Sequence, residues 1–148
     1  MAANISRRAA PESVDANVLL IPISAGELID KITILSIKTQ RVRHPQKRLM
    51  AAQELALLER AAAPLLQVET GLAAEIASLL ERLAAVNLTL WEIEDSLRAM
   101  EQAQDFGARF VDLARSVYRS NDERAQLKNA ISAVAGSALS EVKEHPEY

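Results

Sequence analysis

Eight large apolar residues recur along the middle of this chain at alternating spacings of three and four residues. They are Ile76, Leu79, Leu83, Val86, Leu90, Ile93, Leu97 and Met100. Such a repeat places all eight side chains along one edge of an α-helix, and it predicts a continuous helix over about 72–104. At 1.5 Å per residue this helix is about 50 Å long. Other helices must cover its apolar edge, which we call the seam.

The composition favours an all-α chain with an aliphatic core. Hydrophobic residues make up 49% of the 148 residues and aromatic residues only 3%, and four Gly and five Pro leave few chain breaks. The lack of Cys excludes disulfides, zinc thiolates and thiol catalysis. The net charge of -3 argues against nucleic-acid binding, and no stretch approaches the ~18 consecutive apolar residues of a membrane span. We therefore expect a cytoplasmic protein with no nucleic-acid partner and no membrane span.

Two helices are predicted before the seam. The first, over about 25–43, begins at Ser24 and Glu27, which have capping-box spacing. It carries apolar residues on two sides, which is typical of a helix sandwiched between neighbours, although its β-branched residues keep a strand interpretation open. The second, over about 46–63, ends at Pro64. We expect this second helix to fold back along the seam.

Two more helices are predicted after residue 105. Ser120 and Glu123 repeat the capping-box spacing, so they divide the region into a fourth helix ending near Arg119 and a fifth helix ending before Gly136. The expected fold is an elongated helical bundle of about five helices, built on a long antiparallel, coiled-coil-like hairpin. Its single domain covers 18–136, between a mobile arm over 1–17 and a charged tail over 137–148. Since one short partner cannot cover the whole seam, we expect a homodimer.

Three stretches of the chain together resemble a bacterial protein family. They are 22–35 (PISAGELIDKITIL), Val86-Asn with Leu90-Trp-Glu-Ile-Glu-Asp95, Arg98 and Glu101, and Phe110 with Leu113-Ala-Arg-Ser-Val-Tyr118, Asn121-Asp122, Arg124-Ala125 and Lys128. The family comprises short all-helical proteins with no established function, found as stand-alone chains and beside glycosyltransferases of surface-polysaccharide synthesis. The resemblance covers about 20–143. It implies a helical fold and an association with such enzymes, but no particular activity.

One group of candidate binding residues surrounds the expected junction of the fourth and fifth helices. It consists of Arg115, Tyr118, Asn121, Asp122, Arg124 and Lys128. Free N–H groups and the positive dipole end of the fifth helix would favour an anion such as phosphate or carboxylate there. The alternative is a structural network, in which Arg115 and Asp122 hold the two helices together.

A second group of candidates lies on the predicted third helix. It consists of Asn87, Trp91, Glu94, Asp95 and Arg98. Trp91 is the only Trp, Asn87 precedes it by one turn, and both lie just off the seam. They mark either a pocket or a dimer contact, and the position favours the contact because a polar residue beside a seam more often fixes register than binds a ligand.

Carboxylates also gather on the predicted third helix. Glu92 and Asp95 have the spacing of all-helical nucleotide pyrophosphatases, which resemble this chain only there. A divalent cation needs several converging carboxylates, and the other acidic pair of suitable spacing, Glu141 and Glu144, lies in the tail. The pattern favours a solvated flank of the helix paired with Arg98, so we predict no metal ligands.

The first helix is similar to the helix of three-helix chorismate mutases that carries charged residues beside a leucine run. Asp30, Lys38 and Arg41 lie near the expected places. The spacing from the acid to the arginine differs by one residue, however, which turns a side chain by about 100° around a helix. We therefore predict no catalytic residues and no cofactor.

Two functions remain open from the sequence. The first is a non-enzymatic helical interaction or oligomerisation module, whose partner is a second copy or another protein, within a glycosyltransferase system as the resemblance implies. The alternative is a small enzyme or binder that acts on a phosphorylated sugar or nucleotide through the Arg/Lys anion site and the carboxylates.

Overall fold

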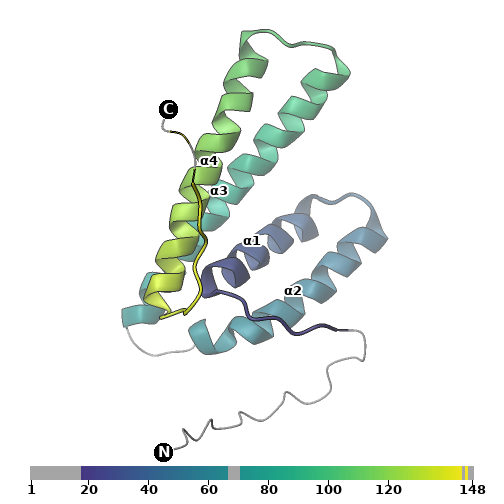
Figure 1. The fold of residues 1–148 in the computed structure, drawn as a ribbon. Helices are drawn as coiled ribbons and strands as arrows, with labels where there is room; N and C mark the ends of the chain where they lie inside the picture. The colour runs from purple at the N-terminus through teal and green to yellow at the C-terminus, as the bar shows by residue number, and fades with distance from the viewer. Residues whose placement is uncertain (1–17, 67–70, 145, 147–148) are drawn as a thin grey trace, which may run out of the picture.

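The computed structural model describes residues 18–66, 71–144 and 146, which form four α-helices and no strand (Figure 1). These helices are α1 (Ala25–Arg41), α2 (Pro45–Leu66), α3 (Gly71–Gln102) and α4 (Ala108–Val134). Helices α1 and α2 pack as one pair and α3 and α4 as another, while α1 also contacts both α3 and α4. The all-α prediction is confirmed, and the described residues form four helices rather than five.

Helix α1 starts as its sequence predicts and is buried by the other three helices. The Ser24 side chain caps it by accepting a hydrogen bond from the Glu27 N–H at 3.2 Å. The Glu27 carboxylate does not reach back, as a full capping box requires, but pairs with Lys128 on α4. Apolar residues from both sides of α1, among them Ile29 and Ile37, are buried. This burial outweighs the low helix propensity of the β-branched residues.

Helix α3 runs without a break through the seam. Five of the eight seam residues are buried, and the other three are half-buried. The helix that lies antiparallel beside it is α4 rather than α2, which packs mainly on α1 (Figure 1). The prediction that the second helix folds back along the seam is therefore wrong. The apolar residues of α2 pack on α1. Helix α4 has 27 residues and is long enough to lie along α3.

Helix α4 passes straight through the predicted junction at Ser120. From Ala108 to Val134 the sequence has no Gly or Pro, so nothing interrupts the backbone ladder. Asn121, which follows the expected capping residue Ser120, donates from Nδ2 to the Val117 carbonyl at 3.1 Å, which is how such residues are accommodated inside a helix. The separate fourth and fifth helices are therefore wrong, as is the helix N-terminus expected between them.

The C-terminal ends of α2 and α4 show that Pro64 does not end its helix, whereas Gly136 does. Pro64 lies inside the last turn of α2 and does not stop it. Its missing N–H and its ring both oppose the helix, but the fully buried Ala62 keeps this turn on the core. Gly136 ends α4 as predicted: it has φ +65°, and the Ser137 N–H donates to the Ser132 carbonyl at 2.8 Å.

The core lies where the first half of α1 meets the other three helices. Ile29, Leu83 and Ile131 are its largest fully buried side chains. The backbones of α1 and α4 touch at Gly26, where an added Cβ would lie 2.1 Å from the Lys128 carbonyl oxygen. The Gly26 N–H donates to Ser132 Oγ at 3.0 Å, so a glycine is needed for this approach.

The segment after α4 lies along that helix (Figure 1). Ser137 Oγ accepts a hydrogen bond from the Ala25 N–H at 2.9 Å, and the Asn129 side chain exchanges two hydrogen bonds with the Glu141 backbone. The segment therefore ties the start of α1 to α4. The arm predicted over 1–17 lies outside the described residues.

Candidate functional site

A buried carboxylate joins α1 to α3 and α4. Asp30 is 3% exposed and accepts two hydrogen bonds from Arg124, Nε to Oδ1 at 2.8 Å and Nη2 to Oδ2 at 2.6 Å. Asn87 Nδ2 donates to Asp30 Oδ1 and to Thr33 Oγ1, each at 2.8 Å. The hydrogen bond to Asp30 raises the pKa of Arg124 above its already high value. The charge of Asp30 is thus fully paired, as its burial requires.

A second ion-pair group, one turn away on α4, is closed. Lys128 is 7% exposed, and its Nζ lies 2.6 Å from Glu27 Oε1 and 2.7 Å from Glu141 Oε2. Burial acts to lower the pKa of Lys128, but the two carboxylates outweigh it and the pKa is raised. This ammonium group is held by protein carboxylates and is not offered to a ligand.

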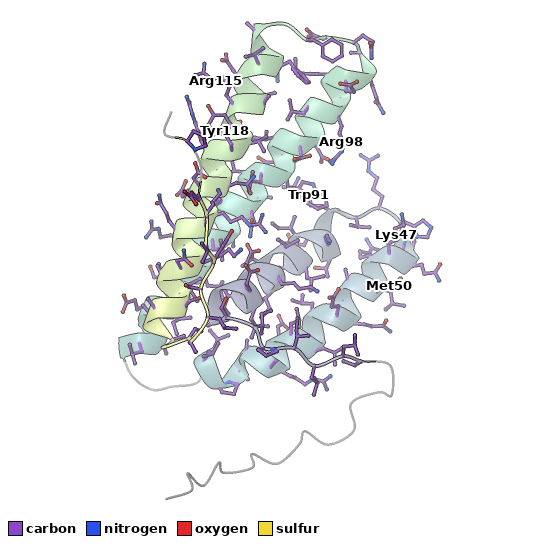
Figure 2. The ribbon with its side chains drawn as sticks, in the orientation of Figure 1. Lys47, Met50, Trp91, Arg98, Arg115 and Tyr118 are labelled. Atoms are coloured by element: carbon purple, nitrogen blue, oxygen red, sulfur yellow. The ribbon has the colours of Figure 1, made fainter. Side chains whose placement is uncertain are left out.

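A cavity of about 370 Å³ opens beside Arg124, between α1, α3 and α4. We call it the three-helix pocket. Its lining comprises Ile34, Ile37, Asn87, Leu90, Trp91, Glu94, Asp95, Arg98, Asn121 and Arg124. In Figure 2, Trp91 and Arg98 lie on the side of α3 that faces the α1–α2 pair. The volume falls within the range of roughly 300–1,000 Å³ that is typical of small-molecule sites.

The pocket offers acceptors and donors around an aromatic side chain. Within the described part of the chain, Asn87 Oδ1 accepts no hydrogen bond, since the two bonds of this side chain use Nδ2. Arg124 Nη1 donates to Asn121 Oδ1 at 3.3 Å, and Arg98 pairs with Glu94 at 3.1 Å. The indole of Trp91 is half-buried. Such a lining suits a ligand that both donates and accepts hydrogen bonds.

The charges of the lining are balanced. Glu94 and Asp95 offset Arg98 and Arg124, and Asp30 lies behind Arg124 as a further negative charge. The three-helix pocket therefore has no excess of positive charge.

The structure brings together residues from both predicted groups. All five of the second group line the three-helix pocket, namely Asn87, Trp91, Glu94, Asp95 and Arg98. From the first group only Asn121 and Arg124 reach it. A pocket was one of the two interpretations of the second group, and the dimer contact stays a prediction.

The other residues of the first group lie elsewhere. Arg115 and Tyr118 project from the opposite side of the α3–α4 pair in Figure 2. A hydrogen bond with Arg115 lowers the pKa of Tyr118. Asp122 pairs with Lys143, and Lys128 belongs to the closed group. Because α4 is continuous, no free N–H groups or dipole end lie here to support the predicted anion site.

Asp30 and Thr33 are the polar residues of this network that sequence reasoning did not assign to a site. The available signal was a carboxylate inside the apolar stretch from Leu28 to Leu35, which needs a partner once that stretch is buried. The partner, Arg124, lies 94 residues away in the sequence, and which residue becomes the partner depends on how α4 packs.

Comparison of the chain with protein-family models, with curated proteins and with solved structures finds no match. Over 18–66, 71–144 and 146, no group of three or more His, Cys, Asp or Glu side chains is placed to hold a metal ion. None of the described helices is long and apolar enough to cross a membrane.

Proposed function

We propose that the protein binds a small, neutral, hydroxyl-rich ligand of the sugar class in the three-helix pocket. The observation that carries this proposal is the unused Asn87 Oδ1 in a pocket that is also lined by the half-buried Trp91 and by guanidinium and carboxylate groups. A sugar ring offers C–H surface to an aromatic side chain, and its hydroxyls both donate and accept hydrogen bonds. The lining supplies both kinds of partner.

The balance of charge argues against an anion as the group that the pocket holds. The guanidinium of Arg124 is neutralised by Asp30. A phosphate in the pocket would also lie near the carboxylates of Glu94 and Asp95, which repel it at short range. The sequence alone suggests a phosphorylated sugar or nucleotide as the ligand. We propose that only its sugar part occupies the pocket and that any phosphate lies outside it.

Trp91 makes this proposal directly testable, because it is the only Trp and reports on the pocket alone. Its fluorescence is recorded during titration with glucose, galactose and N-acetylglucosamine, and separately with inorganic phosphate. We expect the fluorescence to change saturably with at least one sugar and not to change with phosphate. Each titration runs to about 10 mM, which is above a millimolar Kd, equivalent to a binding free energy of roughly −4 kcal/mol. A fluorescence change with phosphate alone contradicts the proposal, and so does the absence of a change with every probe.

A matched pair of variants locates the binding. Arg98→Ala removes an exposed donor of the pocket, and Arg115→Ala removes an arginine of α4 that does not line it. Since a hydrogen bond to a charged group contributes about 1.5–3 kcal/mol, we expect Arg98→Ala to weaken sugar binding roughly tenfold or more. Arg115→Ala should leave it unchanged, and equal effects of the two variants would place the binding elsewhere.

A specific observation also favours the interaction module as a second candidate function. The apolar residues of α1 and α3 that first suggested it are largely covered within the chain, but Leu19, Leu20 and Ile21 are 89%, 72% and 72% exposed. We propose that this segment mediates self-association, and the family resemblance adds glycosyltransferase systems as its setting. Light scattering after size exclusion should give a dimer mass at micromolar concentration, whereas a monomer mass would contradict self-association.

A further inference from the structure

The chain just before α1 exposes an unbroken run of apolar side chains. Residues 18–23, which we call the apolar segment, contain five large aliphatic residues and Pro22, with no charge. Their exposed fractions run from 46% at Ile23 to 89% at Leu19. The segment is not helical, and in Figure 1 it leaves the start of α1 and passes in front of α2. A contiguous apolar surface of this kind marks an interaction site.

The same chain carries an apolar hollow elsewhere. A cavity of about 480 Å³ lies between α1, α2 and α3, and we call it the aliphatic groove. Ile37, Leu66, Leu80 and Leu88 form most of its apolar wall, and Ala84 and Ala85 of α3 leave room between them. The lining also includes the polar or charged residues Thr33, Ser36, Gln40, Arg41 and Glu59. The apolar segment is absent from this lining. The groove therefore has space and apolar character for aliphatic side chains from outside.

We propose that the apolar segment of one copy docks into the aliphatic groove of a second copy, and the reverse, in a closed dimer. This inference rests on the self-association proposed above. Each chain supplies both halves of the contact, so two equivalent contacts form around a two-fold axis. The segment is not helical and enters α1 through Ser24, whose backbone is extended, which allows the exchange without unfolding α1.

The area available is large enough for a stable dimer. A fully buried aliphatic side chain removes roughly 60–120 Å² from water. The five side chains are 46–89% exposed, which together equals about 3.3 fully exposed ones. In two contacts, with the groove surface included, they bury roughly 800–1,600 Å², a range that includes the ~1,000 Å² expected of a specific interface.

The lack of Cys allows a crosslinking test in the full chain. A Leu20→Cys chain is mixed with an Ala84→Cys chain, oxidised, and examined on a non-reducing gel. The control pairs the Leu20→Cys chain with a Val111→Cys chain, whose site on α4 is 50% exposed but outside the groove. We expect a mixed disulfide dimer for the first pair at several times the yield of the control.

The outcomes separate this inference from the self-association on which it rests. A wild-type monomer mass overturns both. A wild-type dimer with equal crosslinking yields in the two pairs overturns the docking site and leaves self-association standing.

Two variants with a common control give a second readout. Leu20→Asp with Ile21→Asp charges the segment, Ala85→Trp fills the groove, and Val111→Asp places a charge on the control site. Circular dichroism checks that each variant remains helical. We expect the first two to weaken dimerisation at least tenfold and the control to dimerise like the wild type. Loss of the dimer with the charged segment but not with the filled groove would mean that the segment docks elsewhere.

Discussion

At the scale of single residues, Asp30 links the stability of the fold to the shape of the site. Its carboxylate is buried on α1 and receives hydrogen bonds from Asn87 of α3 and Arg124 of α4. The same two partners line the three-helix pocket. A buried charge of this kind contributes little net stability while paired, but the loss of one partner is costly.

Arg124→Ala should therefore destabilise the protein strongly. It leaves the Asp30 charge buried without its main partner, so we expect the free energy of unfolding to fall by about 2–4 kcal/mol. This loss is somewhat smaller than that for a fully buried ion pair, because Arg124 is partly exposed. The measurement is urea unfolding followed by circular dichroism. Arg98→Ala, which breaks an exposed pair, should cost at most about 1 kcal/mol. Similar losses in the two variants would contradict this account of Asp30.

Gly26 offers a purely steric test. A Cβ at this position meets the Lys128 backbone at 2.1 Å, so Gly26→Ala should force α1 and α4 apart and destabilise the protein by about 1–3 kcal/mol or more. Gly71→Ala is the matched control because nothing lies within 4 Å of its added Cβ, and α3 already begins there. It should be neutral or stabilising by up to ~1 kcal/mol in the same unfolding experiment.

Lys128 gives a pH dependence with a definite sign. Its pKa is raised in the folded protein by Glu27 and Glu141, against the effect of burial. The ion pairs therefore contribute fully below the unfolded pKa of about 10.4, and the contribution is lost as the pH rises through the folded pKa. The stability difference between wild type and Lys128→Met should shrink above about pH 10.4. A difference that stays constant through this range would show that Lys128 acts through packing alone.

At the scale of helices, local sequence predicts a helix well when its signal is long. The seam predicts α3 nearly to its ends, and Ser24 and Gly136 mark real helix termini. Short signals mislead when packing opposes them. The capping-box spacing at Ser120 is present, but α4 continues because its buried face packs on α1 and α3.

Ser24 and Ser120 allow a direct test of whether a capping-box spacing marks the start of a helix. Ser24 Oγ accepts from the Glu27 N–H, so Ser24→Ala should lower the free energy of unfolding by about 1 kcal/mol. Ser120 lies inside α4, so Ser120→Ala should be neutral or stabilising by about 0.5 kcal/mol, since Ala is the better helix former. Equal losses in thermal or urea unfolding would mean that a helix starts at Ser120 after all.

At the scale of the whole molecule, the site forms where the two helix pairs meet. The α3 side of the three-helix pocket was predictable, because helical spacing alone puts Asn87, Trp91 and Glu94 on neighbouring turns. The α4 side was not, because Arg124 reaches the pocket only through its pairing with a carboxylate far away in the sequence. Helical periodicity shows which residues are buried but not which helix buries them. The same limit explains why the sequence alone predicts α2, and not α4, beside α3.

The most direct test of the proposed function is the two-dimensional ¹H–¹⁵N spectrum of the protein during titration with a neutral sugar. The chain has one indole N–H, from Trp91, and side-chain amides of Asn87 and Asn121 that line the same pocket. We predict saturable shifts of these three signals, with the side-chain amides of α2 unmoved. Shifts confined to α2, or no saturable shift at Trp91, would contradict it.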